Sequence, residues 1–400
     1  MNTRICNRVM MMLTAMAMIT AASASMRADV GTCGGVSTTL PFTDVAGNPF
    51  FCAIAEAYFS GLTNGTSATT YSPTSPVPRE QMAAFITRTL DQSLKRGSRR
   101  AALRQFWTTQ GANDLALTIV GHRPYEVESD GADLWVANYV SGTVSRVRAS
   151  DGRLLETWIA EVGTSGVLVA RGKVFVICNT APGSLFQIDP TQPAGVVTLL
   201  STGLGAGPKG IAYDGQRIWT ANSILPPPTF SGSVSIISLN PVTVTNITAG
   251  FALPHGILYD GTNIWVTDKY AGTLLKLNSL GQIQQTVVVG NNPERPVFDG
   301  TNIWVPNQSD NTVTVVRAST GVVIATLSGN GLNSPRVAAF DGERILVTNY
   351  TDNSVSLWKA TDLTPIGTFS TGAGTDPIGA CSDGLNFWIT LWGTDRLARF

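Results

Sequence analysis

The sequence predicts a mainly β protein, a seven-bladed β-propeller of four-stranded antiparallel blades with a small α-helical module at its N-terminus. Three observations predict this fold. An Asp-Gly pair recurs at intervals of about forty residues over most of the chain. Each interval contains about four short runs rich in Val, Ile, Thr and Trp. Forty Gly and 21 Pro in 400 residues provide the turns that such strands require.

Composition narrows the classes of function. Hydrophobic residues make up 43% of the chain, enough for a packed core. Charged residues are only 14%, and 27 basic residues balance 27 acidic ones. Because phosphate binding needs a clustered basic excess, this balance argues against nucleic acid as a partner and against polybasic adhesion to membranes. Two His in the chain leave little material for zinc sites or catalytic triads, so we expect no metal and no cofactor.

The first segment is typical of a secretory signal peptide. Arg4 and Arg8 precede an apolar run over 9–22, and Ala22-Ser23-Ala24 offers small residues for cleavage. We therefore expect residues 1–24 to be removed and the protein to be exported, to the cell surface, the periplasm or the medium. The alternative is a retained membrane anchor. No later stretch approaches the roughly 20 apolar residues of a spanning helix, so we expect no transmembrane segment after cleavage.

Four Cys remain after Cys6 leaves with the signal peptide. Cys33 and Cys52 lie 19 residues apart, and an oxidising compartment favours a disulfide between them, although free thiols stay equally open. Cys178 and Cys381 sit inside strand-like runs, where we expect them to act as small buried hydrophobes.

Residues 36–92 have a helical pattern. Apolar residues follow a helical period over 49–61 and again over 79–90, with a loop rich in Gly, Thr and Ser between. Two short helices bury little surface alone, so this module should pack against something or self-associate.

Four motifs occur in order in this module: FTDV at 42–45, GLTNGT at 61–66, YSP at 71–73 and VPREQM at 77–82. They resemble an S-layer homology (SLH) domain. The resemblance implies binding of cell-wall polysaccharide or another envelope component, with Arg79 among the contacts. Pro78 replaces the usual threonine of this motif, and one copy is present where wall-anchored proteins usually carry three. The alternative is that Arg79 is a surface residue at the start of a helix.

Residues 93–113 form a basic linker. They include five cationic residues, Lys95, Arg96, Arg99, Arg100 and Arg104. A short basic run of this kind is usually a solvated linker or helix face.

Seven repeats fill residues 114–400. The repeat aspartates are Asp130, Asp214, Asp260, Asp299, Asp341 and Asp383, with Arg171 in the same place in the second repeat, and successive members lie 39 to 46 residues apart. Asp-Gly between apolar runs favours a tight hairpin turn. The last repeat stops after three strands, and 115–121 has the pattern of the missing one. We therefore expect both ends of the repeat region to close the ring in one blade, which removes exposed sheet edges.

Other positions keep a fixed distance from the repeat aspartate. Five residues after it stand Trp135, Val176, Trp219, Trp265, Trp304, Leu346 and Trp388. Eight residues after it stand Asn138, Asn179, Asn222, Asp268, Asn307, Asn349 and Leu391. We expect the first series to pack between blades and the second to satisfy backbone groups of turns. The strings LWVAN at 134–138 and GTVS at 142–145 resemble the YVTN family of propellers (YncE-like), which implies the fold far more than a function.

A candidate ligand site follows the repeat prolines. Six residues before the aspartate stands Pro in six repeats, and the residues that follow are Tyr125, Lys209, His255, Glu294, Arg336 and Ile378, with Gly166 in the second repeat. These positions begin inner strands, vary in type and should ring the central funnel. We predict that Tyr125, Lys209, His255, Glu294 and Arg336 bind an unknown polar small molecule or protein. The alternative is that the charges only solvate a channel.

An enzyme is the competing prediction. The strings FWITLWG at 387–393 and PHGI at 254–257 resemble streptogramin lyase repeats. The resemblance implies histidine base chemistry beside carboxylate-bound magnesium, which would fall on His255 and Glu294. Leu391 stands where a further carboxylate would help. The sequence thus favours an exported, envelope-associated binding protein without catalytic residues, with the lyase-like enzyme as its alternative.

Overall fold

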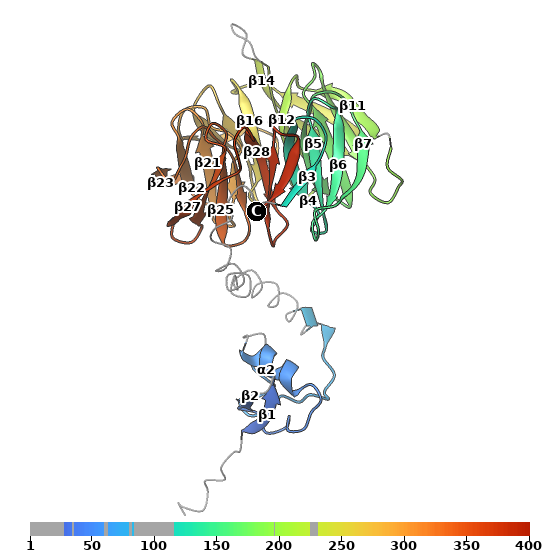
Figure 1. The fold of residues 1–400 in the computed structure, drawn as a ribbon, viewed down its shortest axis with the longest axis vertical. Coiled ribbons are helices and arrows are strands. Elements are labelled where there is room, and N and C mark those ends of the chain that lie inside the picture. Colours follow the sequence, from blue (N-terminus) through green and yellow to red (C-terminus); the bar gives the residue numbers. More distant parts are fainter. Residues whose placement is uncertain are drawn as a thin grey trace, which may run out of the picture. The chain divides into compact units, whose positions relative to one another are not determined.

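The computed structural model describes residues 28–33, 36–59, 63–79, 82–83, 116–195, 197–224 and 231–400. The chain divides into two compact units, Met1–Arg99 and Arg100–Phe400 (Figure 1). The predicted signal peptide, the basic linker 93–113 and most of the predicted helix over 79–90 lie outside the described residues. Within the described ranges, no helix combines the length and the apolar character needed to cross a membrane.

The N-terminal unit contains a hairpin that the sequence pattern did not reveal. Strand β1 (Asp29–Cys33) pairs antiparallel with β2 (Val36–Leu40), and helix α2 (Phe51–Phe59) lies within the range predicted as helical. A disulfide joins Cys33 to Cys52, so it links the hairpin to the helix. Cystine cross-links suit a unit this small, because its own apolar core is limited.

Two of the motifs in this unit are held together by one side chain. The carboxylate of Asp44, in the FTDV string, accepts hydrogen bonds from the backbone N–H groups of Tyr71 and Ser72, in the YSP string. Phe42 is fully buried, and the rings of Tyr58 and Tyr71 pack against it. Motifs almost thirty residues apart therefore form one small core.

The second unit is the predicted propeller, with seven four-stranded antiparallel sheets (Figure 1). Blade one is β4 (Pro124–Ser129), β5 (Asp133–Asn138), β6 (Thr143–Arg148) and β7 (Leu154–Ile159). Blade two is β8 (Thr164–Ala170), β9 (Lys173–Cys178), β10 (Gly183–Ile188) and β11 (Thr198–Leu204). Blade three is β12 (Pro208–Tyr213), β13 (Ile218–Ile224), β14 (Ser231–Leu239) and β15 (Val242–Ile247).

The remaining blades follow the same order, from the inner strand outward. Blade four is β16 (Pro254–Tyr259), β17 (Ile264–Asp268), β18 (Thr273–Leu277) and β19 (Ile283–Val288). Blade five is β20 (Val297–Phe298), β21 (Asn302–Asn307), β22 (Thr312–Arg317) and β23 (Val322–Ser328). Blade six is β24 (Pro335–Phe340), β25 (Arg344–Asn349), β26 (Ser354–Lys359) and β27 (Pro365–Ser370).

Blade seven closes the ring with strands from both ends of the repeat region, as predicted. Its strands β28 (Pro377–Ser382), β29 (Phe387–Leu391) and β30 (Arg396–Arg399) come from the end of the chain, and β3 (Ala116–Ile119) pairs antiparallel with β30. Figure 1 shows β3 among the last strands of the chain. This pairing joins both ends of the repeat region in one blade and so holds the ring closed.

The repeat aspartate explains the spacing of five residues to the large apolar position. In blade one, Asp130 Oδ1 accepts the backbone N–H groups of Ala132 and Asp133, which closes the turn. Its Oδ2 accepts the indole N–H of Trp135 at 2.9 Å. Gly131 has a φ of +93°, which favours glycine at this position. The same indole bond forms from Trp219, Trp265, Trp304 and Trp388 to their repeat aspartates.

The Trp series is core, as predicted, whereas the Asn series behaves differently from the prediction. All five Trp of the series are fully buried. Asp268 does accept backbone N–H groups, from Ala252 and Leu253. The amides of Asn138 and Asn349 instead donate to hydroxyls on the next strand of their own blade, and those of Asn222 and Asn307 do the same. These asparagines therefore tie two strands together rather than capping a turn.

Blade five departs from the repeat at its inner strand. Strand β20 spans only two residues, because Pro296 has no N–H to donate to the ladder. Just before it, the backbone of Arg295 bonds to blade six, donating to Arg336 O and accepting from the N–H of Ala338. This break places Glu294 and Arg295 inside the ring rather than in a regular strand.

Candidate functional site

Four of the five predicted ligand-binding residues line one cavity at the end of the ring where the inner strands begin. The cavity has a volume of about 390 Å3, and its lining includes Tyr125, Lys209, His255 and Arg336. Each follows the residue that opens an inner strand, so the repeat itself brings them together from blades one, three, four and six. We call this cavity the funnel pocket.

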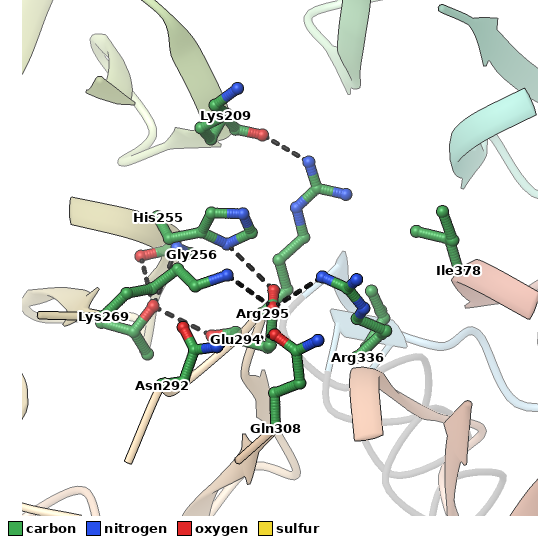
Figure 2. Close-up of polar contacts among 12 residues, drawn as sticks. Lys209, His255, Gly256, Lys269, Asn292, Glu294, Arg295, Gln308, Arg336 and Ile378 are labelled. Atoms are coloured by element: carbon green, nitrogen blue, oxygen red, sulfur yellow. Dashed lines mark hydrogen bonds and ion pairs between the residues drawn. The ribbon is translucent and has the colours of Figure 1, made fainter. Parts of the chain in front are cut away.

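Glu294, the fifth predicted residue, does not line the pocket but contacts three residues that do, and 2% of its surface is exposed. Its Oε1 accepts hydrogen bonds from Lys269 Nζ at 2.6 Å and Arg336 Nη1 at 2.9 Å. Its Oε2 lies 3.3 Å from Nδ1 of His255. Figure 2 shows these three side chains converging on Glu294. These contacts hold the side chains of Lys269 and Arg336 in place around one buried carboxylate.

The pocket is cationic. Lys209, Lys269 and Arg336 line it, and no aspartate or glutamate is among the described residues that do so. Burial lowers the pKa of Lys209 to about 8, and the nearby cations Arg295 and Lys269 act in the same direction. Burial also lowers the pKa of His255 well below its usual range, helped by Lys269 and Arg295, so its imidazole is neutral near pH 7. The lining thus carries positive charge that Glu294 offsets only in part.

Arg295 connects several blades across the central channel. Its guanidinium forms an ion pair with Glu126 of blade one and donates to the backbone carbonyl oxygens of Ser165 and Lys209, in blades two and three. It also lies over the ring of Tyr125, with Cζ 4.7 Å from the ring centroid. Figure 2 shows the side chain extending from Glu294 toward Lys209. One arginine therefore joins blades one, two, three and five across the channel.

A second cavity of about 290 Å3, the channel cavity, is lined by residues of all seven blades. Arg295 and Lys209 line it, and so do small or apolar residues such as Gly166 and Ala338. Glu128 also faces this cavity, and burial raises its pKa to about 8, with Glu126 acting in the same direction. Cys381, predicted to be buried, is half-buried and lines the channel, whereas Cys178 is fully buried.

Sequence reasoning missed a second ring of residues around the pocket. It stands nine residues after the repeat aspartate and comprises Tyr139, Thr180, Ser223, Lys269, Gln308, Tyr350 and Trp392. Thr180, Ser223 and Lys269 line the pocket. The repeat itself indicates these positions. The residue type changes from blade to blade here, whereas the preceding residue is Asn or Asp in six of the seven repeats.

Members of this ring support the predicted residues. The ring of Tyr350 lies under Arg336, with Cζ 4.9 Å from the ring centroid. Gln308, with its amide turned so that both its atoms are satisfied, donates to Glu294 Oε1 at 2.9 Å. Residues from the two sets of repeat positions therefore contact one another around the funnel pocket.

The other predicted residues lie elsewhere or contribute little. Arg79 belongs to the N-terminal unit, where it is exposed. Ile378 takes the corresponding inner-strand place in blade seven and is 7% exposed (Figure 2). Ile224 also lines the pocket, and residues 225–230, which follow it, lie outside the described residues.

The pocket does not fit the magnesium that the streptogramin lyase resemblance implies. Magnesium takes oxygen ligands, usually with one or two carboxylates among them. Glu294 is the carboxylate at this site, and two cations already occupy its Oε1 while His255 faces its Oε2. Among the described residues, no three His, Cys, Asp or Glu side chains gather closely enough to hold a metal ion.

Comparisons with known proteins identify the fold. No protein-family model matches the sequence, and a search of curated proteins finds no significant match, so the SLH and YVTN resemblances stay predictions. A solved streptogramin B lyase matches 73% of this chain and 99% of its own length, at 15% identity and a TM-score of 0.58.

Two further solved structures are similar at the same level. A catalytically inactive virginiamycin B lyase from Staphylococcus aureus, with quinupristin, matches 71% of this chain and 98% of its own, at 16% identity and a TM-score of 0.58. Hydrazine synthase from Kuenenia stuttgartiensis matches 70% of this chain and 95% of its own, at 17% identity and a TM-score of 0.58. At these identities the likeness is one of fold, and the chain is a seven-bladed propeller similar in architecture to these enzymes.

Proposed function

We propose that this protein is an exported binding protein whose propeller holds a small anionic ligand in the funnel pocket. One observation carries the proposal: Lys209, Lys269 and Arg336 line the pocket, and no described acidic residue does. Ligand pockets are typically concave, of a few hundred Å3, with a few convergent polar groups. The funnel pocket has these properties, and its charge selects the sign of the ligand.

The three cations are held in place for such a ligand. Glu294 fixes the two it contacts, Lys269 and Arg336, from below. A bound anion would neutralise the positive charge of these cations that the carboxylate of Glu294 leaves uncompensated. Charge-assisted hydrogen bonds of this kind contribute about 1.5–3 kcal/mol each.

The first test measures binding of phosphate, sulfate and citrate to the full mature chain by isothermal titration calorimetry, with glycerol as the neutral comparison. We expect an anion to bind, and Lys209→Met and Lys269→Met each to weaken it by about 10-fold or more. Lys173→Met is the control, because Lys173 pairs with Asp189 and lines neither the funnel pocket nor the channel cavity. Equal affinity of the wild type and both pocket variants would contradict the proposal.

The N-terminal unit supplies the envelope association in this proposal. Its motifs resemble an SLH domain, and Arg79 is exposed, as a contact with polysaccharide requires. Sedimentation of the mature chain with isolated cell envelopes tests this role. We expect Arg79→Ala to leave more protein in the supernatant, while Arg153→Ala, at an exposed arginine of the propeller, should sediment like the wild type.

A lyase-type activity at the same pocket is the second candidate, and the state of His255 favours it. A buried, neutral imidazole can accept a proton, and it lies beside Glu294 in a fold shared with two lyases. Incubation with quinupristin, the compound named in one of those structures, followed by mass spectrometry tests it. We expect any product to disappear in His255→Ala. An intact compound after long incubation with the wild type would exclude this substrate for the candidate.

A further inference from the structure

Three aromatic side chains form a wall beside the cationic lining of the funnel pocket. The ring centroids of Tyr125 and Tyr139 lie 5.7 Å apart, those of Tyr125 and Trp392 5.8 Å, and those of Tyr139 and Trp392 5.9 Å. They come from the inner strand of blade one, the β5–β6 loop and the β29–β30 loop. All three are half-buried, so each keeps some surface exposed. We call this group the aromatic wall.

The wall meets the pocket at Tyr125, whereas Tyr139 and Trp392 are not among the residues that line the cavity. Tyr125 itself lines the cavity, and so does Asn179, whose Nδ2 donates to the hydroxyl oxygen of Tyr139 at 2.8 Å. Arg295 lies over the ring of Tyr125, and Arg123 lies over that of Trp392 with Cζ 5.2 Å from the centroid. Each guanidinium lies over one face of its ring and helps to hold that ring in place.

Neutral polar groups complete the lining. Asn179, Thr180 and Ser223 contribute an amide and two hydroxyls to the cavity. Lys209, Lys269 and Arg336 belong to blades three, four and six, whereas the wall belongs to blades one and seven. The pocket therefore offers three kinds of contact to one ligand: charge, an aromatic surface, and neutral hydrogen-bonding groups.

Resting on the anionic site proposed above, we infer that the ligand is an acidic sugar. A pyranose ring has apolar C–H faces that pack on aromatic rings, and hydroxyls at its edge that pair with amide and hydroxyl side chains. Its acid group, a carboxylate or a phosphate, would lie over the three cations. An aromatic acid would use the wall and the cations but would leave Asn179, Thr180 and Ser223 without ligand partners.

The ligand panel for the test separates these contacts. Galacturonate carries ring and carboxylate, glucose 6-phosphate carries ring and phosphate, galactose carries the ring alone, glycerate carries acid and hydroxyls without a ring, and benzoate carries an aromatic acid. Calorimetry with the full mature chain should give an acidic sugar at least about 10-fold tighter than galactose, glycerate and benzoate. The better of galacturonate and glucose 6-phosphate identifies the acid group.

Two variants test the wall against a matched control. Tyr139→Leu and Trp392→Leu should weaken the acidic sugar by about 10-fold and leave glycerate unchanged. Tyr213→Leu, at the far end of inner strand β12, should leave both unchanged. Thermal unfolding of each variant checks that the fold persists.

The outcomes distinguish this inference from the function on which it rests. Anions that bind with no preference for a sugar ring overturn the inference and leave the anionic site standing. Benzoate bound as tightly as the sugars, with the same loss in Trp392→Leu, also overturns it and assigns the pocket to aromatic acids. Failure of every anion on the panel, together with failure of phosphate, sulfate and citrate, would remove the proposed function itself.

Discussion

The funnel pocket and the channel cavity share the inner strands of blades one, three, four and six, yet their linings differ. At the funnel end, the equivalent positions carry Tyr125, Lys209, His255 and Arg336, which are large and chemically different from one another. Further along the same strands the channel is lined largely by small or apolar residues. The funnel end thus carries large side chains of different chemistry at equivalent positions, whereas the channel combines small and apolar residues with Glu126, Glu128 and Arg295.

Arg295 stands at the boundary between the two. It belongs to the one blade whose inner strand is broken, and it lines the channel cavity while its guanidinium bonds to the backbone of Lys209, which lines both cavities. Strand β20 is only two residues long, and the backbone of Arg295 instead pairs with blade six. A local departure from the repeat therefore coincides with the boundary between the two cavities.

We expect the largest effect, a loss of stability, from replacing Arg295. Arg295→Met leaves the largely buried carboxylate of Glu126, 14% exposed, without its partner, and we expect the free energy of unfolding in urea to fall by about 3–5 kcal/mol. Arg148→Met is the control, since it breaks an exposed pair with Asp151 and should cost less than about 1 kcal/mol.

The double variant Arg295→Met/Glu126→Gln separates the ion pair from the other contacts of Arg295. We expect it to recover part of the lost stability, because no uncompensated charge remains. If Arg295→Met costs no more than Arg148→Met, Arg295 does not hold the ring together.

A smaller effect should appear in the pH dependence of the funnel pocket. The pKa of Lys209 is lowered to about 8 by burial and by Arg295 and Lys269, with Glu294 acting in the opposite direction. Lys209 therefore loses its charge as the pH rises through 8, and we expect citrate affinity to fall by about 10-fold between pH 7 and pH 9.5. Lys209→Arg keeps the charge and should flatten this profile. A wild-type affinity that stays constant over this range would show that Lys209 does not contact the anion.

An effect of similar size should appear in the channel cavity. Burial raises the pKa of Glu128 to about 8, so the folded protein holds a proton there that the unfolded chain releases near pH 4.5. Stability from this group is thus full below that pH and is lost as the pH rises through 8. We expect a fall of about 1–2 kcal/mol, reduced because Glu128 is only half-buried. Glu128→Gln should remove this slope from unfolding curves measured at pH 5 to 8, and an unchanged slope would contradict the assignment.

The repeat spacing made much of the architecture predictable. Three features predict seven blades closed by a strand near residue 117: the Asp-Gly turns, the Trp five residues later and the incomplete last repeat. Each of them indicates a local turn, a buried position or a missing strand. The inner-strand residues of the funnel followed from the same counting. Lys269 was missed even though its position is just as regular, since its neighbour Asp268 was interpreted as a turn residue.

Sequence alone determined the number of blades, the closure of the ring and the end of the ring at which Tyr125, Lys209, His255 and Arg336 gather, because periodic patterns encode turns and strand faces. Tertiary structure decided the rest: the break at Pro296, the place of Arg295 across the channel, the ion pairs of Glu294 and the aromatic wall of Tyr125, Tyr139 and Trp392. These contacts join residues from different blades, up to about 270 positions apart. No local pattern specifies them, since the geometry of the closed ring sets which side chains meet.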